Sequence, residues 1–123
     1  TNPSVGCVIV KDDKIISIGQ TSFNGRPHAE LNAINNCHEN LKGSKMYVTL
    51  EPCSHYGLSP PCTNSIIKSK ISEVIYSIID IDKKVRGKTK KILSSEKIKV
   101  KTGLFKTEIK KDLFVLFSTP FRR

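Results

Sequence analysis

The sequence has no tryptophan, a single methionine, and only 11 acidic residues against 21 lysines and arginines; its apolar runs are only a few residues long. A membrane-spanning helix needs about 20 apolar residues, so none is expected. No basic start is followed by an apolar stretch, so no secretory signal is predicted and a cytoplasmic location is expected. Because 37% of the residues are hydrophobic and 26% are charged, disorder is excluded as well. The length of 123 residues predicts one domain spanning residues 1–123.

The net charge of +10 allows binding to nucleic acid or to other anions. However, 17 of the 21 cations are lysines spread from Lys11 to Lys111, and no lysine cluster alternates with aromatic residues. A nucleic-acid partner is therefore not expected. The four cysteines could pair in three ways if oxidised. Because no export signal is visible, reduced thiols or metal ligands are favoured.

The hydrophobic pattern predicts strands that alternate with helices. Strands are expected over residues 5–10, 14–19, 45–50, 73–79 and 97–101, and helices over 29–41, 61–70, 88–95 and 107–117. Asp12-Asp13 is expected to form a hairpin turn, and Gly43 to end the first helix. This alternation favours an α/β sandwich whose later strands are parallel and joined by right-handed crossovers.

Three potential metal ligands occupy comparable places in this pattern. His28 precedes the first helix, Cys53 follows the strand ending near residue 50, and Cys62 begins the next helix. The amino ends of such helices and the carboxyl ends of the strands meet at one edge of the sheet, so these side chains can converge. One imidazole and two thiolates leave the fourth position of a tetrahedral zinc for water, as in a catalytic site. The positive ends of the helix dipoles favour the thiolate form.

Glu30 lies two residues beyond His28, close enough to reach a metal-bound water without being a ligand. A carboxylate there can accept a proton from the water and later pass it to a leaving group. A His-x-Glu followed by Pro-Cys and a second cysteine is the signature of zinc-dependent deaminases. In that signature two residues separate the cysteines, whereas here the eight residues 54–61 do so.

Four sequence blocks in order resemble the deaminase domain of the riboflavin-biosynthesis deaminase/reductase. The blocks are NPSVGCVIV (2–10), HAE (28–30), YVTLEPCSHYG (47–57) and PPCT (60–63). The resemblance implies hydrolytic deamination of 2,5-diamino-6-ribosylamino-4(3H)-pyrimidinone 5′-phosphate. It also implies the cytidine-deaminase-like three-layer α/β/α sandwich, with a mixed, mostly parallel five-stranded sheet.

The resemblance also implies roles for particular residues. It maps the ligands of one zinc ion per chain onto His28, Cys53 and Cys62, and the proton shuttle onto Glu30. It maps substrate contacts onto Asn2 and Asp80. For His55, orienting the substrate and hydrogen bonding within its own loop are both open. Cys7 and Cys37 are expected to be buried packing residues.

The chain departs from the family pattern in three ways. Leu58-Ser59 stands where the family has a basic residue followed by threonine, so one polar substrate contact is expected to be missing. The chain starts on the first motif, where the family has a preceding helix, so apolar surface is expected to be exposed and self-association is an option. The fused reductase would need on the order of 200 further residues, so a separate reductase partner and no NADPH site are expected.

Three other functions compete with this interpretation. A tRNA or nucleotide deaminase of the same fold would account for the positive charge, but the long cysteine spacing disfavours it. A structural zinc site would need a fourth protein ligand, for which His55 is the only candidate. An inactive zinc-binding remnant is the third alternative, because of Leu58.

Overall fold

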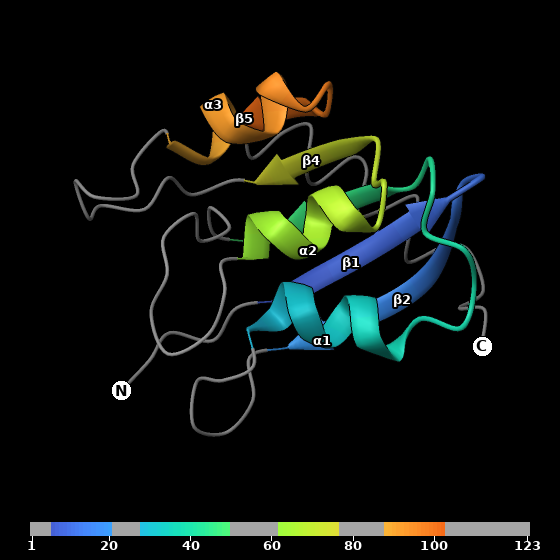
Figure 1. Cartoon of the computed structure of the whole chain (residues 1–123). Helices are drawn as coiled ribbons and strands as arrows, with labels where there is room; N and C mark the ends of the chain where they lie inside the picture. Colours follow the sequence, from blue (N-terminus) through green and yellow to red (C-terminus); the bar gives the residue numbers. More distant parts are fainter. Residues whose placement is uncertain (1–5, 21–27, 50–61, 77–87, 103–123) are drawn as a thin grey trace, which may run out of the picture.

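A five-stranded sheet organises the residues that the computed structural model describes, which are 6–20, 28–49, 62–76 and 88–102 (Figure 1). The elements in chain order are β1 (Gly6–Lys11), β2 (Lys14–Gln20), α1 (Ala29–Asn36), β3 (Lys45–Val48), α2 (Cys62–Lys68), β4 (Glu73–Tyr76), α3 (Lys88–Ser95) and β5 (Lys99–Thr102). The strand order is β2-β1-β3-β4-β5. β1 pairs antiparallel with β2 and β3, whereas β3, β4 and β5 are parallel. β1 therefore runs opposite to the other four described strands, and the expected mixed five-stranded α/β sheet is confirmed.

The β1–β2 hairpin closes through the predicted two-residue turn. Asp12 and Asp13 have φ angles of 52° and 61°, and Lys11 pairs with Lys14 across the turn. Two successive positive φ angles give a turn whose twist matches that of the strands, and aspartate tolerates this conformation better than most residues. The register shifts between Ile9 and Val10, which marks a local irregularity in β1.

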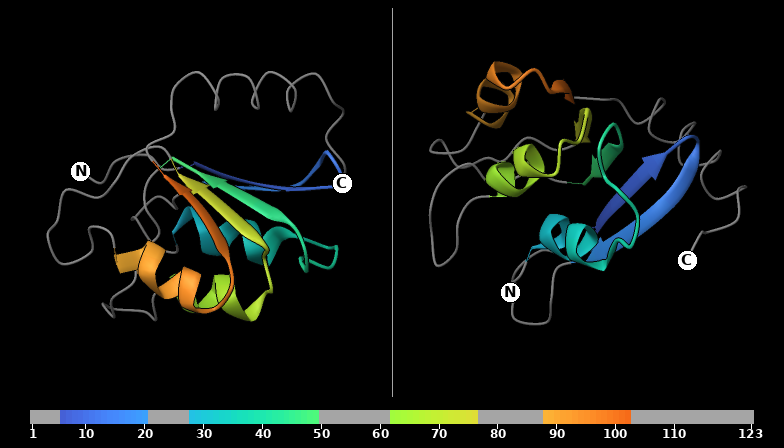
Figure 2. Two further views of the ribbon diagram at one scale, coloured as in Figure 1. Left: turned by 90° about the horizontal axis from the view of Figure 1, so that it is seen from above. Right: turned by 45° about the vertical axis from the view of Figure 1, so that its right-hand side comes forward.

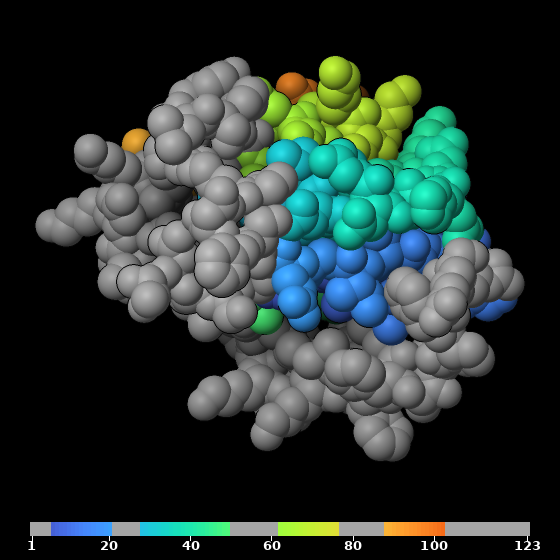
Figure 3. Space-filling view, turned by 90° about the horizontal axis from the view of Figure 1, so that it is seen from below, coloured from blue at the N-terminus to red at the C-terminus, as the bar shows by residue number. Residues whose placement is uncertain are grey.

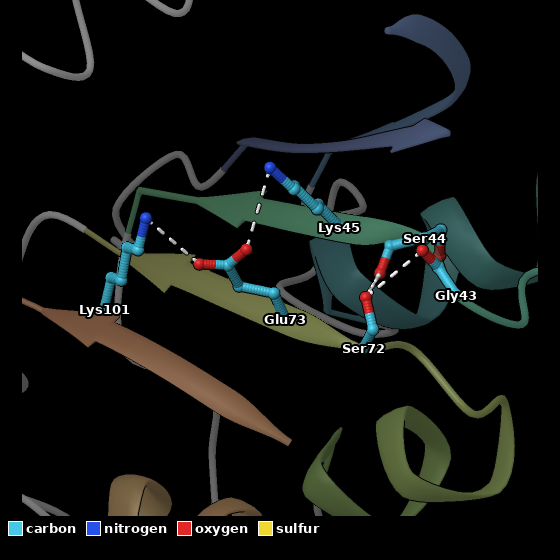
Figure 4. Close-up of polar contacts among 6 residues, drawn as sticks. All are labelled: Gly43, Ser44, Lys45, Ser72, Glu73 and Lys101. Atoms are coloured by element: carbon cyan, nitrogen blue, oxygen red, sulfur yellow. Dashed lines mark hydrogen bonds and ion pairs between the residues drawn. The ribbon is translucent and has the colours of Figure 1, made fainter. Parts of the chain in front are cut away.

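The parallel half of the sheet is held together by ionic and polar contacts as well as by its ladder (Figure 4). The buried carboxylate of Glu73 on β4 lies 3.7 Å from Lys45 Nζ on β3 and 3.3 Å from Lys101 Nζ on β5. Where β4 begins, Ser72 Oγ donates to the carbonyls of Gly43 and Ser44, at 3.1 Å and 3.0 Å. These contacts fix the alignment of β3, β4 and β5.

The three described helices cover one face of the sheet (Figure 2). The core between helices and sheet consists of buried apolar side chains: Cys7, Ile9, Ile16, Ala29, Ala33, Met46, Val48, Ile66, Ile71, Val74, Tyr76, Leu93 and Ile98. A smaller cluster, Val10 and Ile15 with Val8 and Tyr47 packed against them, forms separately. The helix expected over 107–117 lies outside the described residues. None of the described helices is long and apolar enough to cross a membrane.

The first helix is shorter than expected. α1 ends at Asn36, and Cys37 has extended backbone angles (φ −81°, ψ 129°), so Gly43 is not the residue that stops it. Asparagine at the last two positions of α1 is a poor helix former. After the helix, Cys37 Sγ donates to the carbonyls of Ile16 and Glu39. Cys37 and Leu41 still pack against the core. These two apolar side chains are therefore partly buried by an irregular segment and not by a helix.

The other helix and strand boundaries differ from the predicted ones by smaller amounts. α2 ends at Lys68, two residues before the expected end. β5 starts at Lys99 because Lys97 adopts a left-handed conformation, with φ 63°, between α3 and the strand. The helix expected over 88–95 is confirmed. The predicted ends at residues 50, 61 and 77–79 lie outside the described residues.

Candidate metal centre and active site

The helices α1 and α2 both begin at one edge of the sheet. β2 precedes α1 and β3 precedes α2 in the chain, and these two strands run in the same direction. Both helices therefore start beyond the carboxyl ends of strands, where open α/β sheets bind their ligands. His28 occupies the position just before the first residue of α1, and Cys62 is the first residue of α2.

The structure brings His28 and Cys62 together although 34 positions separate them in the sequence. The distance from His28 Nδ1 to Cys62 Sγ is 3.3 Å. The two donors on a tetrahedral zinc would lie about 3.6 Å apart, given bonds of about 2.0–2.1 Å to nitrogen and about 2.3 Å to sulfur. Cys62 is buried and forms no disulfide bond. The imidazole and the thiol thus have the chemistry and the spacing of two zinc ligands.

Glu30 lies in the first turn of α1 and is 4% exposed. Its charge acts on Cys7, which lies on β1 beneath the helix. Burial, and then the negative charge of Glu30, raise the pKa of the Cys7 thiol well above its usual value. Cys7 therefore stays protonated at neutral pH, which agrees with the expected packing role.

The remaining site residues predicted from the sequence lie outside the described residues. They are Cys53, Asn2, His55 and Asp80. Within the part of the chain that the structure describes, no group of three or more His, Cys, Asp and Glu side chains could hold a metal ion. His28 and Cys62 are two of the three expected ligands, and the segment that carries Cys53 begins directly beyond Thr49.

Thr49 anchors the start of that segment to β1. Its backbone N–H donates to the Gly6 carbonyl at 3.2 Å, and its Oγ1 accepts from the Gly6 N–H at 3.2 Å. This reciprocal pair extends the contact between β1 and β3 past the end of the ladder. Thr49, the last described residue before Cys53, therefore lies at the same edge of the sheet as His28 and Cys62.

Two residues near the site had no predicted part in it. Cys7 was expected only as a buried side chain, and its proximity to Glu30 depends on how α1 crosses β1. Gly19 on β2 lies directly under α1, since an added Cβ would collide with backbone atoms of Ala29 and Ala33. A glycine inside an alternating strand pattern is the signal that could have indicated such a close approach.

Comparison with known proteins agrees with this geometry. The family model described as the cytidine and deoxycytidylate deaminase zinc-binding region matches residues 1–78. This match covers more than half of the chain, and the mixed sheet and the His28–Cys62 pair are consistent with it. The chain therefore belongs to the cytidine and deoxycytidylate deaminase family.

Within this family the chain is similar to diaminohydroxyphosphoribosylaminopyrimidine deaminases. It is 48% identical over 110 residues to that enzyme of Buchnera aphidicola subsp. Schizaphis graminum, covering 89% of this chain and 75% of the relative. It is 44% identical to the riboflavin biosynthesis protein RibD of Chlamydia pneumoniae, covering 91% of this chain and 30% of the relative.

A solved structure leads to the same group. The diaminohydroxyphosphoribosylaminopyrimidine deaminase/5-amino-6-(5-phosphoribosylamino)uracil reductase of Thermotoga maritima superposes with a TM-score of 0.77 at 40% identity. The match covers 88% of this chain and 32% of that one. The chain thus spans about a third of the longer relatives and most of the shorter one.

Proposed function

We propose that the chain is a single zinc-dependent deaminase domain that converts 2,5-diamino-6-ribosylamino-4(3H)-pyrimidinone 5′-phosphate to its deaminated product in riboflavin biosynthesis. The observation that carries the proposal is the His28–Cys62 pair, 3.3 Å apart, with the buried Glu30 two residues from His28. The name of the Buchnera relative supports the choice of substrate.

In this proposal His28 Nδ1, Cys62 Sγ and the thiolate of Cys53 would hold one zinc ion. A bound zinc ion lowers the pKa of a water molecule in its open position and so supplies a nucleophile at neutral pH. The Glu30 carboxylate, in the first turn of α1, would take a proton from the attacking water and pass it to the exocyclic nitrogen of the substrate. In the net reaction the ring carbon would gain the oxygen of water, its bond to the exocyclic nitrogen would break, and that nitrogen would leave as ammonia.

Asn2 and Asp80 contact the substrate in this proposal, and His55 is a further candidate for orienting it. The product still needs reduction, and we propose that a reductase supplies it, either as a separate partner or as a fused domain. The Thermotoga relative, whose name combines a deaminase with a reductase, supports this pairing. A cytoplasmic location fits Cys7, Cys37 and Cys62, which form no disulfide bonds.

Ammonia release from the ribosylaminopyrimidine phosphate tests the proposal, together with zinc content per chain. We expect one zinc ion and substrate-dependent ammonia release in the wild-type chain. Glu30→Gln should retain the zinc and the fold, while kcat falls by roughly 10²–10⁴-fold because the proton shuttle is lost. His28→Ala should lose the zinc and the activity together.

Three results would contradict the proposal. Zinc-loaded protein that releases ammonia from a tRNA anticodon stem but not from the pyrimidine would assign it to nucleic-acid deamination. Zinc without activity on either substrate would indicate an inactive remnant. Near-normal turnover in Glu30→Gln would remove this residue from the mechanism.

A further inference from the structure

Gly19 on β2 lies in direct backbone contact with α1, the helix that carries His28 and Glu30. A Cβ added at Gly19 would collide with the Ala29 carbonyl oxygen and the Ala33 nitrogen, and would lie 2.9 Å from Ala33 Cα. All three are backbone atoms, so no side-chain rotation can relieve the contact. Figure 3 shows α1 and β2 side by side on the surface of the molecule.

Two hydrogen bonds hold the helix to the same stretch of β2. Ser17 Oγ, which is buried, donates to the Ala33 carbonyl at 2.5 Å. Asn32 Nδ2 donates to the Gln20 carbonyl at 2.5 Å. Ser17, Gly19 and Gln20 thus contact α1 between Ala29 and Ala33.

The Ala29 carbonyl belongs to the residue between His28 and Glu30. The atom that an alanine at Gly19 would displace is therefore part of the His-Ala-Glu segment itself. Gly19 also pairs with Cys7 across the β1–β2 ladder, and Cys7 experiences the charge of Glu30. A shift of the first turn of α1 away from β2 would move the His28 imidazole relative to Cys62 and the Glu30 carboxylate relative to β1.

We propose that Gly19 is a positioning residue of the active site: by lacking a side chain, it sets the depth at which α1 lies on β2 and thereby the places of His28 and Glu30. Ser17 and Asn32 maintain that depth through their hydrogen bonds. This inference rests on the proposed function, since it concerns the same zinc ligand and the same proton shuttle.

The test compares Gly19→Ala with Gly43→Ala in the full chain. Gly43 has a φ of 81° and nothing within 4 Å of an added Cβ, so its replacement strains a turn without touching α1. It serves as a control for a general loss of stability. The affinity for Zn²⁺ is measured by competition with a chromophoric chelator, the ligand geometry by the visible absorption of the Co²⁺-loaded protein, and turnover by ammonia release.

For Gly19→Ala we expect the Zn²⁺ affinity to fall by about 10- to 100-fold, as when a group that orients a ligand is lost. The Co²⁺ absorption bands should shift, and kcat should fall by roughly 10²-fold with a smaller change in KM. Gly43→Ala should keep the wild-type values for all of these while its melting temperature falls. Ser17→Ala and Asn32→Ala should lie between wild type and Gly19→Ala in Zn²⁺ affinity.

Wild-type Zn²⁺ affinity, Co²⁺ spectrum and kcat in a folded Gly19→Ala would overturn the inference and leave the proposed function intact. If Gly19→Ala does not fold, the Ser17→Ala and Asn32→Ala variants decide, and wild-type zinc affinity in both would overturn it. A wild-type chain that takes up no zinc would overturn the proposed function and this inference together.

Discussion

Cys7 and Cys37 both pack against the core, but their thiols have different surroundings. Cys7 is 1% exposed and lies near the charge of Glu30, whereas Cys37 is half-buried at the end of α1. The thiolate is the form of cysteine that reacts with alkylating reagents. Burial and the neighbouring charge hold Cys7 in the thiol form by raising its pKa. The two residues should therefore differ strongly in reactivity.

We expect iodoacetamide at pH 8 to modify Cys37 in the folded chain and to leave Cys7 unmodified until the chain unfolds. Peptide mass mapping after timed quenching measures both rates. Cys7→Ala serves as the control that assigns the slow site. Equal rates at the two cysteines in the folded protein would contradict the burial and charge described for Cys7.

The same raised pKa has a defined effect on stability. Below about pH 8.5, the usual thiol value, Cys7 is protonated in both the folded and unfolded chain and contributes no pH dependence. Above that value the unfolded chain releases the proton while the folded chain keeps it. The free energy of unfolding therefore falls as the pH rises through this window, and Cys7→Ala should reduce the slope.

Among elements, α3 shows how a helix can end without the glycine that is common at this position. Lys97 adopts a φ of 63°, and the Ile98 and Lys97 N–H groups donate to the carbonyls of Leu93 and Ser94, each at 3.0 Å. This is the Schellman arrangement, in which the first residue after the cap takes the left-handed conformation. Leu93 and Ile98 are both buried, which supplies the apolar contact that accompanies it.

Lys97→Gly should increase the free energy of unfolding by about 0.5–1 kcal/mol, because glycine adopts the left-handed conformation without the steric cost that lysine bears. Urea denaturation followed by far-UV circular dichroism measures the change. Lys99→Gly is the matched control, because Lys99 lies in β5 and glycine weakens a strand. Stabilisation by both substitutions, or by neither, would contradict this account.

The same elements show what the sequence can predict. Helix 88–95 and the Asp12-Asp13 turn have local signals, namely apolar spacing and turn residues, and both are confirmed. The predicted end of α1 is wrong because Leu41 continues the helical spacing although the chain is irregular there. Whether an apolar residue packs from a helix or from a loop depends on tertiary contacts, which periodicity does not report.

The candidate site was predictable in part for a similar reason. Residue types and order indicate the zinc ligands, and topology explains why His28 and Cys62 meet. The contact of Gly19 with α1 depends on how closely two elements pack in space, and the spacing of residues along the sequence does not reveal that distance. His55, Asp80 and Asn2 stay predictions.

At the scale of the whole molecule, a metal ion on His28 and Cys62 would link two halves of the sheet. α1 packs on the antiparallel β1–β2 hairpin, and α2 crosses between the parallel strands β3 and β4 (Figure 1). A ligand that binds only the folded chain stabilises it, by about 2.7 kcal/mol at a concentration 100 times its Kd.

Removal of zinc with EDTA should therefore lower the melting temperature of the wild-type chain, and re-addition of Zn²⁺ should restore it. Differential scanning fluorimetry measures both steps. In His28→Ala the chelator should have no effect, because the site is already lost. An equal drop in that variant would show that the chelator acts elsewhere.

The β1–β2 hairpin also bears on how the chain folds. Its strands are joined by two residues and α1 is the next described element, so contacts among these three elements span shorter stretches of chain than the pairing of β1 with β3. Pairing of β1 with β3, and of β3 with β4, joins parts of the chain that are far apart, and such closures are slow. We therefore expect the hairpin with α1 to form first and the half that carries Cys62 to dock on it later. Because His28 and Cys62 lie on the two halves, the rate of zinc uptake during refolding would report when that docking occurs.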